Sequence, residues 1–169
     1  MIQIEESGLN FGEFQDCDVF KIEKSEFVLN NEGVKSCEFV WHDNEKQLIW
    51  FLEAKSSVPN PQNSKEKFDD YFQEIFEKLE NSVVATSMGK LGKLNQVNEE
   101  LSEPLLQLDW STIGFKLVLV IPTAPNHVLP PLSEKLRSLF IRQVKLWGIS
   151  ISDIAVINEG MARNSGLLV

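Results

Sequence analysis

An unbroken apolar run from Leu48 to Leu52, with the sequence LIWFL, constrains the fold more than any other segment of the chain. A strand that is apolar at every position is typical of the centre of a sheet that is covered on both faces. The run leads directly into Glu53 and Lys55, which place a carboxylate and an ammonium group at the end of that strand. Burying such groups is costly unless they pair, reach a cleft or bind a ligand. The end of this strand is therefore the first candidate for a functional site.

An antiparallel hairpin is predicted around this strand. Residues 34–41 and 47–56 are rich in β-branched and aromatic residues, and the polar segment between them predicts a turn. If the turn closes on Asp43 to Lys46, Glu38 lies on the same face of the sheet as Glu53, as its diagonal neighbour. Their backbones are then roughly 7–8 Å apart, close enough for both carboxylates to reach one ion. A register shift of a single residue moves Glu38 to the opposite face.

The residues at this site resemble the signature of the PD-(D/E)xK superfamily, the restriction-endonuclease-like nucleases. The resemblance is carried by Glu38 on the second predicted strand, by Glu53-Ala-Lys55 on the third, and by the helix predicted after them. It implies that Glu38 and Glu53 bind Mg²⁺ or Mn²⁺, and that Lys55 assists the attacking water or the scissile phosphate. It also implies an additional acidic ligand upstream, for which Glu23 is the candidate. In two departures from the family, Glu38 follows Cys37 instead of proline, and it is Glu where Asp is commoner.

The remaining elements predict an α/β (α+β mixed) fold in one domain over residues 1–169, in which helices flank a central mixed β-sheet. The predicted order β-β-β-α-β-α-β resembles the restriction-endonuclease-like core, except that no N-terminal helix is evident. Apolar residues at helical spacing indicate a helix that is capped by Ser64 and runs toward Met88. The other expected elements are a strand over 17–29, a short helix over 95–108 broken at Pro104, a strand over 115–121, a helix between Pro131 and Gly148, and a strand over 154–157.

The chain is acidic, with a formal net charge of −9 and a pI near 4.8. Such a charge opposes binding to nucleic acid, because Lys and Arg contacts to phosphates supply much of that affinity. A bound metal ion and a local basic patch offset it, and the candidate patch residues are Lys90, Lys93, Lys135, Arg137, Arg142 and Lys145. The last four are more typical of the solvated face of an amphipathic helix. The charge favours a protein that works beside a basic partner subunit or on a restricted substrate. Nucleic acid is the expected partner, and a protein partner or a homo-oligomer is a further candidate.

Cysteine, histidine and hydropathy patterns argue against several other classes. Cys17 and Cys37 lie in strand-like segments without metal-ligand spacing, and we expect reduced, packed thiols in a cytoplasmic protein. His42 in the turn and His127 in a proline-rich loop are expected to be solvated, and neither belongs to a catalytic triad pattern. The sequence shows no signal-peptide pattern, no apolar stretch long enough to span a membrane and no glycine-rich phosphate-binding motif.

Three hypotheses for the function remain open. The first is metal-dependent hydrolysis of phosphodiester bonds in DNA or RNA, with Lys55, Glu53 and Glu38 as catalytic residues and Glu38, Glu53 and Glu23 around Mg²⁺ or Mn²⁺. The second is a noncatalytic protein of the same fold that acts as an interaction subunit or inhibitor in a larger complex. The acidity of the chain motivates this hypothesis. The third is an unrelated α/β binding module in which the Glu53-Ala-Lys55 pattern arose by chance.

Overall fold

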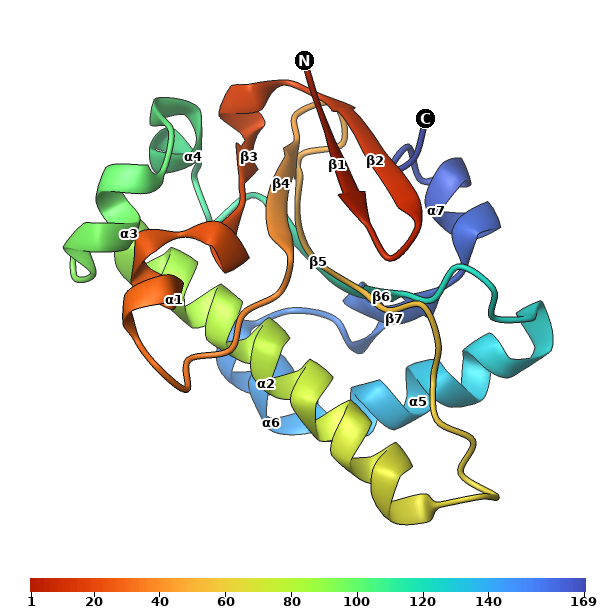
Figure 1. Ribbon diagram of the computed structural model, residues 1–169. Helices are drawn as coiled ribbons and strands as arrows, with labels where there is room; N and C mark the ends of the chain where they lie inside the picture. The colour runs from red at the N-terminus through yellow and green to blue at the C-terminus, as the bar shows by residue number, and fades with distance from the viewer.

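The computed structural model, which describes all residues from Met1 to Val169, has a five-stranded mixed sheet at its centre (Figure 1). The strand order is β3-β4-β5-β6-β7, in which β3, β4 and β5 pair antiparallel, and β6 and β7 continue the sheet in parallel with β5. A separate antiparallel hairpin is formed by β1 and β2. The strands are β1 (Ile2–Glu6), β2 (Leu9–Phe14), β3 (Val19–Phe20), β4 (Phe39–Asp43), β5 (Leu48–Ala54), β6 (Gly114–Val120) and β7 (Ile154–Ile157).

Helices pack against this sheet and give the protein its α+β class. Figure 1 shows α2, α5 and α6 along one side of the sheet, and the β1–β2 hairpin with α7 on the other side. The helices are α1 (Glu26–Asn30), α2 (Lys65–Lys90), α3 (Asn95–Glu100), α4 (Glu103–Gln107), α5 (Leu129–Leu139), α6 (Ile141–Trp147) and α7 (Glu159–Asn164). None of them combines the length and the apolar character that crossing a bilayer requires.

Strand β5 lies in the middle of the sheet, and its side chains alternate between two hydrophobic cores. Ile49 and Phe51 belong to the larger core, which α2 and α5 cover, whereas Trp50 and Leu52 belong to the smaller core beneath the β1–β2 hairpin. All four side chains are buried, so the prediction of a strand buried on both faces is confirmed. The same alternation directs Glu53 toward the face that α2 covers.

The hairpin of β4 and β5 closes in a wider turn than predicted. Asp43 pairs with Leu48, and not with Lys46, so that residues 44–47 form the turn. The Lys46 amide donates to Asp43 Oδ1 at 3.1 Å, and the Lys46 ammonium lies 3.2 Å from Oδ2, which stabilises this wider form. The predicted register was therefore wrong by two residues, a shift that leaves each strand residue on its predicted face.

The first arm of the hairpin is also shorter than predicted, because residues 34–38 lie beside α2 and not in the sheet. The amide of Cys37 donates to Ser82 Oγ on α2 at 2.8 Å. Glu38 lies directly before β4, where its amide donates to the Leu52 carbonyl at 2.9 Å. The position of the Glu38 side chain is therefore set by this junction, and strand alternation alone does not determine it.

The predicted strand over residues 17–29 is mostly absent. Within this segment only the two residues of β3 form a strand, which pairs with β4. The rest of the segment forms two short 3-10 turns and α1. Ser25 accounts for this difference, because its Oγ accepts a hydrogen bond from the Val28 amide at 3.2 Å and caps α1. A capping serine in the middle of the apolar pattern ends the strand early and places Glu23 in the turn before the helix.

The remaining predicted elements lie near their expected positions, with two differences. Helix α2 and strands β6 and β7 are confirmed, and Ser64 caps α2 by accepting a hydrogen bond from the Lys67 amide at 3.2 Å. Pro104 does not break a helix but lies in the first turn of α4, where its missing N–H forfeits no hydrogen bond. The helix expected before Gly148 divides into α5 and α6 at Phe140. Gly148 ends α6 in the left-handed conformation, with φ 66°.

In addition to α1, the β1–β2 hairpin and α7 were not predicted. Both cover the face of the sheet opposite α2, together with Leu167 and Leu168 near the end of the chain. Phe11 and Phe14 of the hairpin pack against Phe39, with ring centroids 5.4 and 5.9 Å apart. The predicted order of elements was therefore incomplete at both ends of the chain.

Gly89 on α2 gives a prediction about how α2 and α3 pack. A Cβ at this position would overlap the side chain of Val97, which is fully buried on α3. We expect Gly89→Ala to lower the free energy of unfolding by about 1–3 kcal/mol, the usual effect of overpacking. Gly160→Ala is the matched control, because a Cβ there meets nothing closer than 3.6 Å in α7. Urea unfolding of both variants checks the prediction, and a Gly89→Ala protein as stable as the wild type would contradict it.

Candidate functional site

Glu53 is the most deeply buried charged residue at the end of β5. Its side chain is 0% exposed, and Oε1 lies 2.8 Å from Lys78 Nζ and 3.2 Å from Lys55 Nζ. Its second oxygen, Oε2, has no hydrogen-bond partner. Burial raises the pKa of Glu53, and the ammonium groups of Lys78 and Lys55 oppose that rise. A buried carboxylate with one free oxygen has capacity to bind a further cation.

Lys78 on α2 belongs to this site but was not predicted from the sequence. It is 9% exposed, and Nζ lies 2.8 Å from Glu53 Oε1 and 3.8 Å from Glu23 Oε1. Burial alone would lower the pKa of Lys78, but the Glu53 carboxylate reverses that effect and the net shift is upward. A signal was present in the sequence, since Lys78 follows Tyr71 by seven residues and so shares its helix face. A lysine on the apolar stripe of a helix must find a buried acid.

A cluster of three carboxylates lies beside this pair. Glu6 at the end of β1, Glu23 in the turn before α1, and Glu38 before β4 bring oxygen atoms within 4.8 Å of one another. Burial raises the pKa of Glu38 to about 8, and a hydrogen bond to Glu23 and the negative charge of Glu53 add to the rise. Lys24 neutralises part of the cluster from outside, with Nζ 3.7 Å from Glu6 Oε1. Glu6 was not predicted as a site residue, because the hairpin to which it belongs was not predicted.

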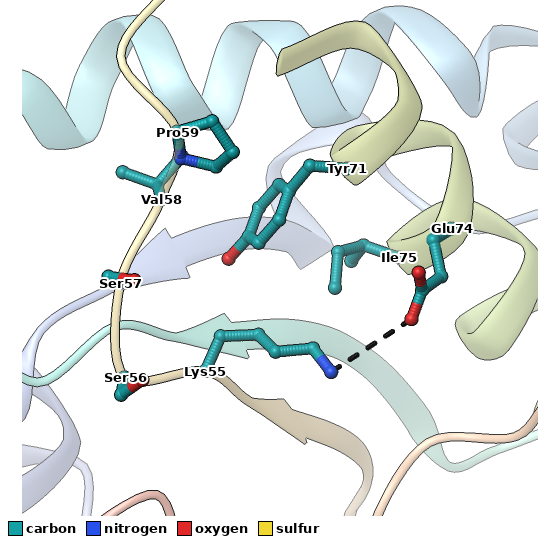
Figure 2. Close-up of a pocket in the computed structure, with 8 residues that line it drawn as sticks. All are labelled: Lys55, Ser56, Ser57, Val58, Pro59, Tyr71, Glu74 and Ile75. Carbon is teal, nitrogen blue, oxygen red and sulfur yellow. Dashed lines mark ion pairs between the residues drawn. The ribbon is translucent and has the colours of Figure 1, made fainter. Parts of the chain in front are cut away.

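Lys55 connects the buried acid to an open pocket of about 370 Å³. Its side chain is 31% exposed, and Nζ lies 3.2 Å from Glu53 Oε1 and 4.0 Å from Glu74 Oε1. Figure 2 shows the Lys55 side chain extending from the end of β5 to meet Glu74 on α2, with the loop after β5 on the other side of the pocket. The pocket is lined by Lys55, Ser56, Ser57, Val58, Pro59, Tyr71, Glu74 and Ile75. A ligand in the pocket therefore meets an ammonium group whose other contacts are carboxylates.

Tyr71 forms the aromatic wall of the same pocket and also packs from α2 against the larger hydrophobic core. Its hydroxyl is buried without a hydrogen-bond partner, and in Figure 2 it points toward the loop after β5. Burial raises the pKa of Tyr71, and the negative charges of Glu53 and Glu74 raise it further. The hydroxyl therefore remains neutral at physiological pH and is an available hydrogen-bond donor.

The structure thus brings the predicted residues together in two linked groups. Glu53 and Lys55 form one group in direct contact, and Glu23 and Glu38 form the other. Lys78 joins the two groups, because its ammonium lies near both Glu53 and Glu23. The sequence predicted a pair of Glu38 and Glu53 with Glu23 nearby, and the structure adds Glu6, whose carboxylate lies within 4.8 Å of those of Glu23 and Glu38.

The donor set of this site fits a hard divalent cation. Carboxylate oxygens are the ligands that Mg²⁺ and Mn²⁺ prefer. Glu6, Glu23 and Glu38 bring such oxygens within 4.8 Å of one another, and Glu53 adds a buried carboxylate on the other side of Lys78. The Oε2 atom of Glu53 has no hydrogen-bond partner and is therefore an oxygen that a cation can contact. Mg²⁺ usually needs only one or two protein carboxylates in addition to water and phosphate. The residues present therefore meet the requirement for such an ion.

Outside the site, His42 and Cys17 differ from their expected environments, whereas Cys37 is the packed thiol that was expected. His42 is buried in β4, with Nδ1 3.6 Å from Asp18 Oδ1, and not in a solvated turn, because the wider turn extends β4 by two residues. Cys17 is exposed, since the expected strand is replaced there by a 3-10 turn. Cys37 is buried and free, and burial raises the pKa of its thiol to about 12. These positions add no reactive group to the site.

The raised pKa of Glu38 predicts a pH dependence of stability. The folded protein keeps a proton on Glu38 between its ordinary pKa of 4.5 and about 8, where the unfolded chain has lost it. Its contribution to the free energy of unfolding is therefore full below pH 4.5 and disappears as the pH rises through 8. Glu38→Gln mimics the protonated form. At pH 9 we therefore expect the free energy of unfolding of this variant to be about 2 kcal/mol higher than that of the wild type, a value reduced for the partial exposure of Glu38.

The matched control for this prediction is Glu32→Gln, which removes a carboxylate from the exposed turn before residue 34. Chemical unfolding at pH 4 and pH 9 in the presence of a chelator measures both variants. Parallel stability curves for Glu38→Gln and the wild type would contradict the account of Glu38.

Comparison with known proteins gives no family for this chain. No family model, curated protein or solved structure matches it. The α+β class with a mixed sheet is shared by many unrelated activities, so the fold class alone does not assign a function. The function is therefore inferred from the side chains of the site.

Proposed function

We propose that this protein is a metal-dependent phosphodiesterase of the PD-(D/E)xK type that acts on DNA or RNA. One observation carries the proposal: the buried carboxylate of Glu53 contacts both Lys55, which faces the pocket, and Lys78, which is buried. Phosphodiester hydrolysis needs a carboxylate-bound cation next to a second positive group that faces the substrate. The mixed sheet with β5 at its centre, preceded by antiparallel strands and followed by α2, supports a restriction-endonuclease-like core.

The roles follow from where each side chain lies. Glu53, Glu38 and Glu23 would hold Mg²⁺ or Mn²⁺, which when bound polarises a phosphate oxygen and lowers the pKa of a water molecule. Lys55 faces the pocket and stabilises the negative charge that develops on the phosphate. Ser56 and Ser57 line the pocket directly after Lys55, and their hydroxyls can donate to phosphate oxygens.

The net charge of −9 bears on which partners fit this proposal. Without a large basic surface, affinity for a long polyanion at physiological salt is low. We therefore propose that the nucleic acid is presented by a basic partner subunit, or that the substrate is short enough to be held by the pocket and the ion alone.

The proposal is tested by the substitution Lys55→Ala. Purified protein is incubated with labelled DNA and RNA in Mg²⁺, in Mn²⁺ and in a chelator. We expect cleavage only with a metal ion, and a loss of about 10²–10³-fold in Lys55→Ala, as for removal of one electrostatic stabiliser. Lys46→Ala is the matched control, because Lys46 lies at the other end of β5 and pairs with Asp43. Cleavage that persists in the chelator, or that is unchanged in Lys55→Ala, would overturn the assignment.

A noncatalytic interaction subunit or inhibitor of the same fold is the second candidate. The observation that favours it is the contact of Lys78 with Glu53, which gives the buried carboxylate a cationic partner within the chain. On this alternative, calorimetric titration with Mn²⁺ shows no binding that depends on Glu38 or Glu53. Binding that is lost in Glu53→Gln would exclude this candidate.

A further inference from the structure

Lys78 occupies a distinctive position among the lysines of the site. Its Nζ lies between carboxylates of two different elements, 2.8 Å from Glu53 Oε1 on β5 and 3.8 Å from Glu23 Oε1 in the turn before α1. The side chain is 11% exposed, whereas that of Lys55 is 31% exposed and faces the pocket. A single positive charge surrounded by carboxylate oxygens at these distances is what a bound cation would provide there.

Lys78 also has an alternative partner one helical turn away. Glu74 precedes it by four residues on α2, and its side chain is 45% exposed. A Glu followed by a Lys four residues later on a helix is the favoured orientation for such an ion pair. The spacing therefore places the Glu74 carboxylate within reach of the Lys78 ammonium as a second partner.

The alternative position of Lys78 affects Lys55. In the structure Lys55 lies near two carboxylates, Glu53 at 3.2 Å and Glu74 at 4.0 Å. A divalent cation on Glu53 would neutralise the first, and Lys78 at Glu74 would neutralise the second. Both attractions that engage the Lys55 ammonium would then be weakened, which leaves it free to contact a phosphate in the pocket.

We propose that Lys78 is an exchangeable counter-ion, whose ammonium group occupies the cation position between Glu53 and Glu23 and moves toward Glu74 when a divalent ion binds. This inference rests on the metal site of the proposed function and describes its regulation. The exchange lowers the apparent affinity for the ion, because the ion must first displace the lysine. It also orders the reaction, since Lys55 becomes available to a phosphate only after the metal has bound.

The test compares Mn²⁺ binding by calorimetry in the wild type, in Lys78→Met and in Lys135→Met. Both variants remove one positive charge, but Lys135 pairs with Asp69 on the exposed side of α2 and does not contact the site. We expect Mn²⁺ to bind Lys78→Met about 5- to 150-fold more tightly than the wild type, the usual range of coupling between two sites. Lys135→Met should change the affinity by about twofold or less, as expected for a screened charge. Unchanged or weaker binding in Lys78→Met, with a wild type that binds Mn²⁺, would overturn the exchange.

A measurement on the wild type covers the case in which Lys78→Met does not fold. The lysine ammonium resonances are followed by nitrogen-15 NMR during titration with Mg²⁺. The Lys78 signal should shift with saturation, and that of Lys135 should not. A Lys78 signal that is unchanged at saturating Mg²⁺ would overturn the exchange.

The outcomes separate the inference from the proposed function. Mn²⁺ binding by Lys78→Met but not by the wild type would support Lys78 as the occupant of the cation position, and would count against a metal-dependent activity. Absence of Mn²⁺ binding in both folded proteins would overturn the inference and the metal site together.

Discussion

Glu53→Gln is expected to reduce metal-dependent hydrolysis of nucleic acid by at least about 10²–10³-fold, the cost of losing one main electrostatic element of such a site. Glutamine keeps the size of the side chain but removes the charge that Lys55 and Lys78 both contact. The variant therefore loses affinity for the ion, and Lys55 loses the partner that holds it at the entrance to the pocket. The measurement is kcat for cleavage of a labelled oligonucleotide across a range of Mn²⁺ concentrations.

Glu66→Gln is the matched control for this experiment, because Glu66 lies in the exposed first turn of α2. It should retain the activity of the wild type. An activity of Glu53→Gln within about twofold of that of Glu66→Gln would show that Glu53 is not a metal ligand, because the loss of a ligand reduces activity by far more than twofold.

Lys78→Met is expected to lower the free energy of unfolding of the metal-free protein by about 3–5 kcal/mol. The substitution leaves the fully buried carboxylate of Glu53 with Lys55 as its only close cation, and Lys55 is partly screened by solvent. For a chain of this length, such a loss corresponds to a fall in Tm of very roughly 6–20 °C. Urea unfolding in a chelator gives the free energy directly.

The double variant Lys78→Met with Glu53→Leu separates the ion pair from simple packing. Replacing both members of a buried pair by apolar residues of similar size is often neutral, so we expect most of the lost stability to return. A double variant no more stable than Lys78→Met alone would show that Lys78 acts through its packing, and that its charge is not needed to balance Glu53.

The centre of the fold could be predicted from the sequence because its signals are local and strong. The apolar run of β5, the capping serine of α2 and the apolar segments of β6 and β7 each specify one element without reference to the rest of the chain. The β1–β2 hairpin carries weaker signals, since its short strands gain their stability by packing on Phe39 and its neighbours. Such an element is stable only in its tertiary context, which a sequence pattern does not show.

Those residues of the site that follow a strong local signal could also be predicted from the sequence. Glu53 and Lys55 follow a buried strand, so their position could be inferred from β5 alone. The place of Glu38 depended on a turn, and that turn is two residues wider because Lys46 binds back to Asp43. Lys78 and Glu6 come from α2 and β1, and only the folded arrangement of these elements brings their charges to Glu53 and Glu38.

The most direct test of the metal site is a crystal structure of the wild type with Mn²⁺, in which anomalous scattering locates the ion. The account predicts one anomalous peak bound by Glu53 together with Glu38 or Glu23, and an ammonium of Lys78 displaced toward Glu74. No peak at this position, with Lys78 still in contact with Glu53 at a saturating concentration of Mn²⁺, would contradict the central claim.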